Sequence, residues 1–365
     1  MDKKMKRSLL ETVFSPVKIF SHMARMYRWW QGENIYPIEV ELGPAGPANC
    51  NNRCNFCMHR SYYDARAMME FKFYKRIIDE LKELDIKGMV FSASGEPLTN
   101  PEIVEFISYT KRKGIDVALV TNGTFWRRDG VIEAVAREVT WVRTSLDAGT
   151  QGTRAKIHGV GQADFDCVLG ALTMLANEKA RIKGMCHIGA QMVVTEENWW
   201  EVYEATRKVK ETGIDYFQIK PVVFHPENNK PQLSCKFWET AMILIEASKR
   251  DFEDKDFDVF VKYDQFDAIM TPDYEKDTYK KCRATFFPII EATGKVYYCS
   301  QKRGLPEFEL GNLHRNSFKE IWESERRKRV IKGIDVNKCQ PICRCHWLNK
   351  MLKTVELGEN EPSFV

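Results

Sequence analysis

Short apolar, β-branched runs alternate with longer amphipathic stretches from about residue 38 to residue 263. Such alternation predicts strand–helix units around a parallel sheet. The runs with strand character cover residues 38–42, 88–92, 116–121, 140–145, 186–195, 216–221 and 258–263. The stretches with a helical period cover residues 71–84, 100–113, 165–178, 199–212 and 236–249. We therefore expect an α/β barrel of six strands or slightly more, with its functional residues at the carboxyl ends of the strands.

The pattern changes after about residue 265. Residues 285–301 read as a hairpin with Thr293-Gly294-Lys295 at its turn, and residues 317–329 read as one helix. We place a domain boundary near residues 265–280. The expected organisation is an N-terminal helical segment, a barrel, a small C-terminal domain and a tail, over residues 1–36, 37–270, 271–350 and 351–365.

The N-terminal segment is amphipathic and basic. Its apolar stripe consists of Leu10, Val13, Phe14, Val17, Phe20, Met23, Tyr27 and Trp30. Around it stand Lys3, Lys4, Lys6, Arg7, Lys18, Arg25 and Arg28. A basic amphipathic helix can lie on a membrane, but such a stripe more often docks on its own domain, and Pro16 would kink the helix. We expect docking rather than membrane contact.

Composition narrows the class of protein only a little. The chain has 365 residues, 44% hydrophobic and 29% charged, which is typical of a globular protein with ample core. A net charge of +4, with both signs mixed along the chain, gives no case for nucleic acid as a partner. There is no run of 18 apolar residues and no visible signal peptide. We expect a cytoplasmic protein.

The cysteines are more informative than the charge. There are 11, and in a reducing compartment clustered cysteines indicate metal before disulfides. Three lie close together near residue 50, and five lie in the C-terminal part: Cys282, Cys299, Cys339, Cys343 and Cys345. Cys167, Cys186 and Cys235 are isolated, and we expect each to be a small buried apolar residue.

Cys50, Cys54 and Cys57 have the spacing Cys-x3-Cys-x2-Cys on a loop after the first expected strand. A structural zinc site and an electron-transfer [4Fe–4S] cluster both take four protein ligands. Three cysteines leave one iron of a cluster open to substrate. The alternative is a zinc knuckle completed by His59.

This triplet resembles the signature of the radical S-adenosylmethionine (SAM) enzymes. The resemblance implies a partial (β/α)6 TIM-like barrel in which the amino and carboxylate groups of SAM chelate the open iron. It also implies reductive cleavage of SAM to a 5′-deoxyadenosyl radical that takes hydrogen from a substrate. The cofactor carries that chemistry, and the protein supplies aim and shielding. An electron donor such as flavodoxin or ferredoxin would be the partner.

Further motifs follow in the order that the family has. Phe56 matches the aromatic residue that lies beside adenine in relatives. Ser94-Gly95-Glu96-Pro97 follows the second strand and resembles the Gly-Gly-Glu-Pro motif that meets the amino group of SAM, with Ser94 in place of the first glycine. Alone, such a stretch would be an ordinary turn.

The fourth and fifth strands carry the remaining expected SAM contacts. Ser145 and Asp147 resemble a pair that faces the ribose and methionyl part of SAM. Where many relatives have arginine before glycine, this chain reads Ile157-His158-Gly159, so Arg154 is a substitute candidate, and Gln191 is a candidate ribose contact. Each polar group taken alone would equally suit a cap at a strand end.

The five late cysteines can ligate zinc or a second cluster. Cys282 and Cys299 flank Gly294-Lys295-Val296-Tyr297, and Gly311-Asn312-Leu313 and residues 317–322 follow. This layout resembles the SPASM/Twitch extension of radical SAM enzymes, which carries auxiliary [4Fe–4S] clusters. Five cysteines imply one auxiliary cluster, held by Cys282, Cys299 and two of Cys339, Cys343 and Cys345.

Two substrate classes are compatible with this layout. One is a sugar, an aminocyclitol or a similar natural-product intermediate that is oxidised or epimerised. The other is a ribosomal peptide that undergoes crosslinking, thioether formation or epimerisation. The 36 residues before the first strand are too few for a leader-binding domain, so we favour the small molecule.

The candidate catalytic residues depend on the reaction. Cys235 would donate hydrogen in an epimerase, although a packed cysteine at a helix start is the simpler interpretation. Asp264 and Lys220, at strand ends, are candidate proton handlers for an oxidation. A protein of another class, which binds iron–sulfur or zinc without catalysis, remains an alternative.

Overall fold

The computed structural model describes residues 16–57, 65–223, 235–270, 279–283, 286–339, 343 and 345–357. Its strands form one sheet in the order β10-β9-β8-β1-β2-β3-β4-β5-β6-β7. The strands from β1 to β7 are parallel and follow chain order. They are β1 (Glu39–Leu42), β2 (Gly88–Phe91), β3 (Asp116–Thr121), β4 (Trp141–Ser145), β5 (His187–Val194), β6 (Tyr216–Pro221) and β7 (Asp258–Val261). All seven expected strands are confirmed.

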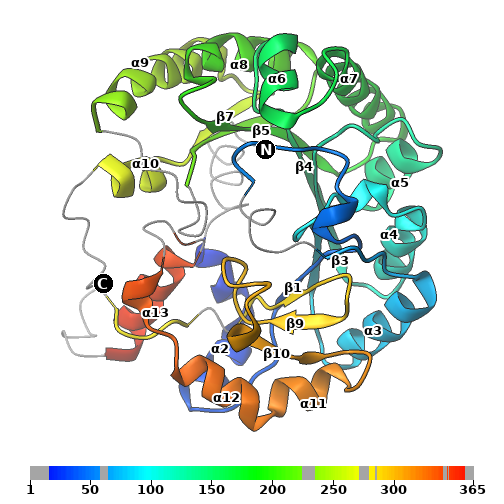
Figure 1. The fold of residues 1–365 in the computed structure, drawn as a ribbon, viewed down its shortest axis with the longest axis vertical. Coiled ribbons are helices and arrows are strands. Elements are labelled where there is room, and N and C mark those ends of the chain that lie inside the picture. Colours follow the sequence, from blue (N-terminus) through cyan, green and yellow to red (C-terminus); the bar gives the residue numbers. More distant parts are fainter. Residues whose placement is uncertain are drawn as a thin grey trace.

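Helices surround the outside of the parallel strands (Figure 1). They are α3 (Phe71–Glu83), α4 (Ile103–Arg112), α5 (Val131–Glu138), α6 (Gln151–His158), α7 (Asp164–Ile182), α8 (Val202–Glu211), α9 (Cys235–Phe252) and α10 (Tyr263–Met270). The strand order has two ends, β7 and β10, so strand pairing does not close the barrel. The architecture is the expected partial barrel, with one more parallel strand than six.

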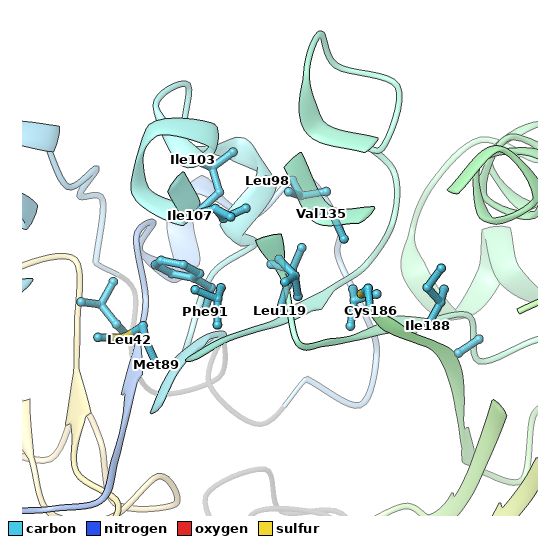
Figure 2. Close-up of a cluster of buried hydrophobic side chains, with 14 of the residues drawn as sticks. Leu42, Met89, Phe91, Leu98, Ile103, Ile107, Leu119, Val135, Cys186 and Ile188 are labelled. Carbon is cyan, nitrogen blue, oxygen red and sulfur yellow. The ribbon is translucent and has the colours of Figure 1, made fainter. Parts of the chain in front are cut away.

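The core lies between the sheet and these helices. Leu42, Met89, Phe91, Leu119 and Ile188 project from the strands toward Ile103, Ile107 and Val135 of the helices (Figure 2). Side chains on a strand alternate between its two faces, so every second residue enters this layer. A fully buried aliphatic side chain contributes about 1.5–3 kcal/mol. The other strand face points into the barrel, where the candidate site lies.

The C-terminal hairpin extends the barrel sheet. Strand β8 (Ile289–Ile290) pairs in parallel with β1 and antiparallel with β9 (Lys295–Tyr297), and β10 (Glu309–Asn312) follows. Gly294 has a φ of +76° at the turn, a conformation that glycine adopts readily. The hairpin expected over residues 285–301 is confirmed over the described residues.

The helix expected over residues 317–329 is two helices, α11 (Phe318–Glu323) and α12 (Glu325–Lys332). Ser324 interrupts the chain with an extended backbone, and its hydroxyl accepts from the backbone N–H of Arg327. Serine favours this N-cap role over a helix interior, which explains the break. Helix α13 (His346–Leu357) ends the described chain.

The N-terminal segment docks on the protein as expected, but not through the expected stripe. It forms a 3₁₀ helix, η1 (Pro16–His22), and then α2 (Met23–Trp30). Ile19 and Met26 are buried in a cluster that includes Leu348 and Leu352 of α13. By contrast, the stripe residues Phe20, Met23, Tyr27 and Trp30 are 40%, 58%, 59% and 52% exposed.

The 3₁₀ turn explains that difference. It advances three residues per turn rather than 3.6, so the buried face rotates away from the face that α-helical spacing predicts. The stripe residues Leu10, Val13 and Phe14 lie outside the described residues. Among the residues described, no helix is both long enough and apolar enough to cross a membrane.

The isolated cysteines have different environments. Cys186, just before β5, is buried as expected. Cys167 on α7 is exposed, so the expectation was wrong there, because this position lies on the solvent side of the helix. Cys235 begins α9, but its side chain lies outside the described residues.

Candidate active site

The cysteine triplet lies on the loop that follows β1. Cys50 caps the short 3₁₀ helix η2 (Pro47–Asn49), and the N–H of Cys57 donates to the carbonyl of Cys54 at 3.2 Å. The backbone N–H groups of Arg53 and Asn55 donate to the carbonyls of His158 and Ile157, at 2.6 and 3.0 Å. The loop is therefore anchored to the end of α6. His59 lies outside the described residues, so the structure does not place the fourth ligand of the zinc alternative.

The neighbouring thiols influence the ionisation of Cys50 and Cys54. Burial raises the pKa of Cys50 to about 11, with the negative charges of Glu96 and Cys57 as further causes. Burial also raises the pKa of Cys54 well above its usual value, with Asp147, Cys57 and Cys50 as further causes. Thiolates in such a place need a bound cation. The donor set therefore fits iron.

Gly95 and Glu96 follow β2 beside this loop. A Cβ at Gly95 would lie 2.4 Å from the carbonyl oxygens of both Ala45 and Gly46, so only glycine fits. Glu96 is buried, and its carboxylate accepts from the backbone N–H groups of Leu98 and Asn122 at 2.9 and 2.6 Å. It also accepts from the hydroxyl of Thr121 at 2.6 Å.

Burial raises the pKa of Glu96 to about 7 despite these donors. Each oxygen of a carboxylate has two lone pairs, so the group can accept further donors. An ammonium group in this place would favour the ionised form.

Ser94, the departure from the family motif, contacts the C-terminal hairpin. Its hydroxyl donates to Glu291 at 2.7 Å, and both residues are buried. Arg303 donates to Glu41 of β1 at 2.8 Å, and Glu41 accepts from the N–H of Ala93 at 3.0 Å. This buried network joins the motif after β2 to the segment that follows Cys299. Beyond the serine itself, no local pattern predicts this network.

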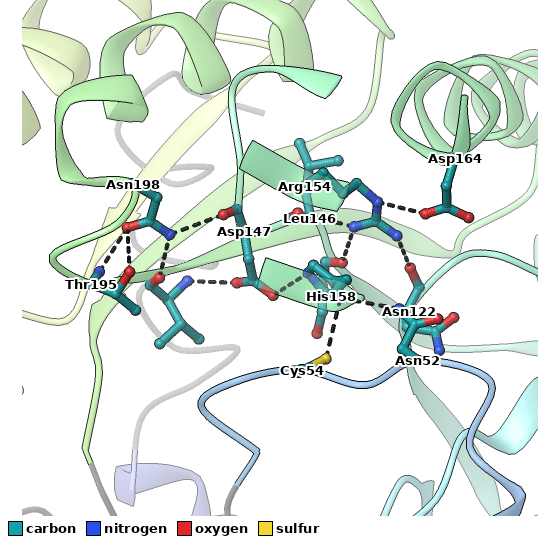
Figure 3. Close-up of polar contacts among 12 residues, drawn as sticks. Asn52, Cys54, Asn122, Leu146, Asp147, Arg154, His158, Asp164, Thr195 and Asn198 are labelled. Atoms are coloured by element: carbon teal, nitrogen blue, oxygen red, sulfur yellow. Dashed lines mark hydrogen bonds and ion pairs between the residues drawn. The ribbon is translucent and has the colours of Figure 1, made fainter. Parts of the chain in front are cut away.

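Asp147 and His158 form a second buried pair behind Cys54 (Figure 3). His158 Nε2 lies 3.1 Å from Asp147 Oδ2, and His158 Nδ1 lies 3.3 Å from Cys54 Sγ. Asp147 Oδ1 accepts from the N–H of Val193 at 2.7 Å. His158 stands where the family resemblance predicts an arginine, and it connects the cysteine loop to the residue pair after β4.

A chain of amides indicates which nitrogen of His158 carries the proton. The N–H of Thr124 donates to Asn122, whose amide donates to Asn51, and Asn51 donates to Asn52. The amide nitrogen of Asn52 lies 3.1 Å from His158 Nδ1. Because the Thr124 N–H can only donate, the chain makes Nδ1 an acceptor and directs Nε2–H toward Asp147.

Arg154 on α6 is fully buried, and its guanidinium lies between Asp164 and the backbone beside Leu146 and Asn122 (Figure 3). Its guanidinium donates to Asp164 at 2.7 Å and to the carbonyls of Ser145, Leu146 and Asn122 at 2.8–2.9 Å. These carbonyls lie at the ends of β3 and β4. The side chain thus holds two strand ends together, and its role as a substitute SAM contact stays a prediction.

The other predicted site residues lie on or near the barrel side of the later strands. Ser145 pairs across from Gln191, and the side-chain oxygen of Gln191 is buried without a hydrogen-bond partner. Lys220 is on β6, and Asp264 is in the first turn of α10, directly after β7. Phe56 lies edge-on to the ring of His158, with 6.3 Å between the ring centroids.

The five late cysteines line one cavity of about 350 Å³. Burial raises the pKa of Cys299 to about 12, and the thiols of Cys343, Cys282 and Cys339 add to the increase. The backbone N–H of Cys345 donates to the sulfur of Cys343 at 3.4 Å. No group of three or more His, Cys, Asp or Glu side chains in the described part of the chain is arranged to hold a single metal ion. Thiols spread around one cavity fit a multi-iron cluster.

Comparison with known proteins places the chain in a family. The model of the radical SAM superfamily matches residues 47–209, and the model of the SPASM iron–sulfur cluster-binding domain matches residues 282–346. The chain belongs to the radical SAM superfamily, in its SPASM-containing branch. It is therefore a radical SAM enzyme that uses SAM and [4Fe–4S] clusters.

Three relatives with named activities match most of the chain at low sequence identity. The chain is 21% identical over 330 residues to the tungsten-containing aldehyde ferredoxin oxidoreductase cofactor-modifying protein of Pyrococcus furiosus, covering 87% of this chain and 91% of that protein. It is 23% identical to the subtilosin biosynthesis protein AlbA of Bacillus subtilis, covering 80% of this chain and 61% of AlbA. It is 22% identical to the PqqA peptide cyclase of Gluconobacter oxydans, covering 78% and 77%.

Solved structures share the fold. The structure of SuiB from Streptococcus suis bound to its precursor peptide SuiA has a TM-score of 0.63 with 16% identity. The match covers 88% of this chain and 72% of SuiB. At this level of identity the likeness concerns the fold alone.

Proposed function

We propose that this radical SAM enzyme abstracts hydrogen from a peptide substrate. The observation that carries the proposal is the pair of sites, an open cysteine triplet at the barrel mouth and a cavity lined by five cysteines, in a chain whose relatives include AlbA and the PqqA peptide cyclase. The sugar or aminocyclitol that we expected from the sequence finds no support in these comparisons. The peptide alternative fits them better.

The chain's own residues would hold the cofactors as follows. Cys50, Cys54 and Cys57 would bind the first cluster, and Gly95 and Glu96 would meet the amino group of SAM. When bound, the cluster and SAM supply the 5′-deoxyadenosyl radical that abstracts hydrogen. The loop contacts with α6 and the packing of the Asp147–His158 pair behind Cys54 keep the triplet in place.

The auxiliary cluster would use Cys282, Cys299, Cys339 and Cys343. The thiols of Cys282, Cys339 and Cys343 all act on the ionisation of Cys299, so these four lie near one another. Cys345 would be the spare cysteine, with its backbone N–H stabilising the thiolate of Cys343. An N–H donor to a cluster sulfur favours the reduced state. Held by these four cysteines, the group would supply an electron acceptor for the oxidation of a substrate radical.

A second candidate substrate is a small cofactor. The Pyrococcus furiosus relative is named as a cofactor-modifying protein, and the two chains match over nearly their whole lengths. This candidate shares the cluster chemistry and differs only in what enters the barrel.

The test uses the anaerobically reconstituted enzyme with SAM and dithionite. Short synthetic peptides corresponding to open reading frames that flank the gene are incubated with it in H₂O and in D₂O. A peptide that loses hydrogen mass, or gains deuterium from solvent, together with stoichiometric 5′-deoxyadenosine, supports the proposal. If every such peptide is unchanged while a cofactor-like small molecule is converted, the peptide proposal is wrong.

A further inference from the structure

Three cations point into the barrel from its later strands: Arg143 of β4, Lys220 of β6 and Lys262 directly after β7. Their chain neighbours Val142, Ile219 and Val261 belong to the core on the helix side of the sheet. Since side chains alternate along a strand, the three cations lie on the opposite side. They therefore face the barrel interior.

The strand register brings the two lysines together. Ile219 pairs with Val261, and the N–H of Lys262 donates to the carbonyl of Ile219 at 2.9 Å, so Lys220 and Lys262 are neighbours across β6 and β7. The pKa of Lys220 is lowered to about 8, chiefly by burial and then by the positive charges of Arg143 and Lys262. Like charges gathered in one half-buried place repel one another unless an anion joins them.

The nearby carboxylates do not neutralise the lysines. The negative charge of Asp147 acts on Lys220 and that of Asp264 acts on Lys262, but in the described part of the chain neither carboxylate forms an ion pair with its lysine. The carboxylate of Asp147 already has two other neighbours, because Oδ1 accepts from the N–H of Val193 and Oδ2 lies 3.1 Å from His158 Nε2. In the part of the chain that the structure describes, neither lysine ammonium group has a hydrogen bond or an ion pair.

Two buried amides beside the cations also lack partners. Gln218 Oε1 accepts from Arg143 at 2.8 Å, but Gln218 Nε2 has no hydrogen-bond partner. Gln191 Oε1, directly across the β5–β6 pair, has none either. Gln218 and Gln191 are 1% and 5% exposed. An unpaired buried amide is destabilising. Gln218 Nε2 is an unused donor and suits an anion beside the cations, whereas Gln191 Oε1 is an unused acceptor and suits the ribose hydroxyl of SAM expected there.

We propose that Arg143, Lys220 and Lys262 bind a carboxylate of the substrate peptide, from an Asp or Glu side chain or from the C-terminus. The inference rests on the proposed function, because it assumes that a peptide enters this barrel. Arginine binds carboxylates bidentately, and a lysine adds a compact charge. The strand ends expected to contact SAM follow β1, β2, β4 and β5, so Lys220 on β6 and Lys262 after β7 are left to the substrate. Arg143 is on β4, but its guanidinium reaches across to Gln218 of β6.

The test measures which peptides the enzyme retains. A synthetic pool of random decapeptides, half with free and half with amidated C-termini, is passed over immobilised, reconstituted enzyme with SAM. Retained peptides are sequenced by mass spectrometry. The wild type is compared with Lys220→Met/Lys262→Met, with the charge-reversed Lys220→Glu/Lys262→Glu, and with Lys255→Met as a control. Lys255 is a solvent-exposed lysine on the loop just before β7, and its side chain pairs with Asp256 at the surface.

The wild type and the Lys255→Met control should retain acid-bearing peptides at least about tenfold better than peptides without an acidic group. The Lys220→Met/Lys262→Met variant, called the Met variant below, should lose this preference. The charge-reversed variant should instead prefer Lys- or Arg-bearing peptides, which a merely structural role would not produce. Loss of the preference on amidation identifies the C-terminus as the source, and its persistence identifies a side chain. SAM affinity, measured by calorimetry, should change less than about threefold in the Met variant.

Three results would overturn the inference. Retained peptides without an acidic preference would refute the carboxylate site while leaving a peptide substrate intact. A large loss of SAM affinity in the Met variant would assign the cations to the carboxylate of SAM. If the wild type retains no peptide at all, the proposed function itself fails, and this inference fails with it.

Discussion

At the scale of single residues, the contacts of the Arg154 side chain could not be predicted from the sequence. Its position before the Ile157-His158-Gly159 stretch makes it a candidate SAM contact, which stays a prediction. The structure adds that its guanidinium is fully buried and donates to Asp164 and three backbone carbonyls. A motif gives the spacing of a cation but not the direction of its side chain. His158 shows the same limit in a different way. The sequence does not predict its contact with Cys54, because only the fold brings the two side chains together.

Replacing Arg154 should therefore lower stability. Arg154→Met leaves Asp164 as a buried unpaired charge and three carbonyls without a donor, so we expect a loss of about 3–5 kcal/mol in the free energy of unfolding. Arg181→Met is the matched control, because Arg181 pairs with Glu178 on an exposed helix face and should change stability by less than about 0.5 kcal/mol. Urea denaturation of both variants measures this. Equal, small losses would contradict the structural role.

Replacing Lys220 should raise the free energy of unfolding, the opposite of the effect expected at Arg154. Its pKa is lowered to about 8 in the folded chain from 10.5 in the unfolded chain, so the fold disfavours the charged form. Below pH 8 the lysine is charged in both states, and the full penalty is present. As the pH rises from about 8 to 10.5, the folded lysine is neutral while the unfolded one stays charged, and the penalty disappears.

Lys220→Met should accordingly stabilise the ligand-free protein at pH 7 by about 1–2 kcal/mol, after allowance for partial exposure to solvent. The gain should shrink toward pH 10.5. Thermal unfolding of the wild type and the variant across this pH range tests the sign. A destabilised variant at pH 7 would mean that the lysine already has a partner in the fold.

At the scale of elements, the sequence was most informative about the strands. All seven barrel strands were predicted because buried parallel strands are short, β-branched runs between helical patterns, a local signal. The N-terminal stripe was misassigned because η1 is a 3₁₀ helix, and the break at Ser324 was missed because a serine at a helix end looks like one within a helix. Contacts between distant elements, such as Ser94 with Glu291, left no local signal.

The segments after β1 and β2 meet at Gly95, and this contact is testable. A methyl group there would collide with two carbonyl oxygens of the backbone that leads to the cysteine triplet. Gly95→Ala should therefore displace that segment and weaken SAM binding to the reconstituted enzyme by about tenfold or more. Gly152→Ala on α6 is the matched control, since no atom lies within 4 Å of its added methyl group. Equal SAM affinity in the two variants would contradict the close packing.

At the scale of the whole molecule, the two cysteine groups define a protein with two clusters. Sequence spacing predicted both groups, whereas the fold was needed to bring five cysteines from a hairpin and a terminal segment to one cavity. Sequence also left the spare cysteine open. We propose Cys345, because the thiols of Cys343, Cys282 and Cys339 all act on the ionisation of Cys299.

Iron content tests this assignment. Two [4Fe–4S] clusters correspond to about eight irons per chain. Cys299→Ala/Cys343→Ala should reduce the count to about four, and Cys345→Ala should leave it near eight. Iron analysis and Mössbauer spectroscopy of anaerobically reconstituted protein measure the count. A loss of iron in Cys345→Ala equal to that of the double variant would show that Cys345 is a ligand.

The most direct test of the account is release of 5′-deoxyadenosine from SAM by the anaerobically reconstituted protein with dithionite. We predict release by the wild type, and none by Cys50→Ala/Cys54→Ala/Cys57→Ala, which should still hold the auxiliary cluster with about four irons. Equal release by the triple variant, or none by fully loaded wild type, would contradict the assignment of the cysteine triplet to SAM cleavage.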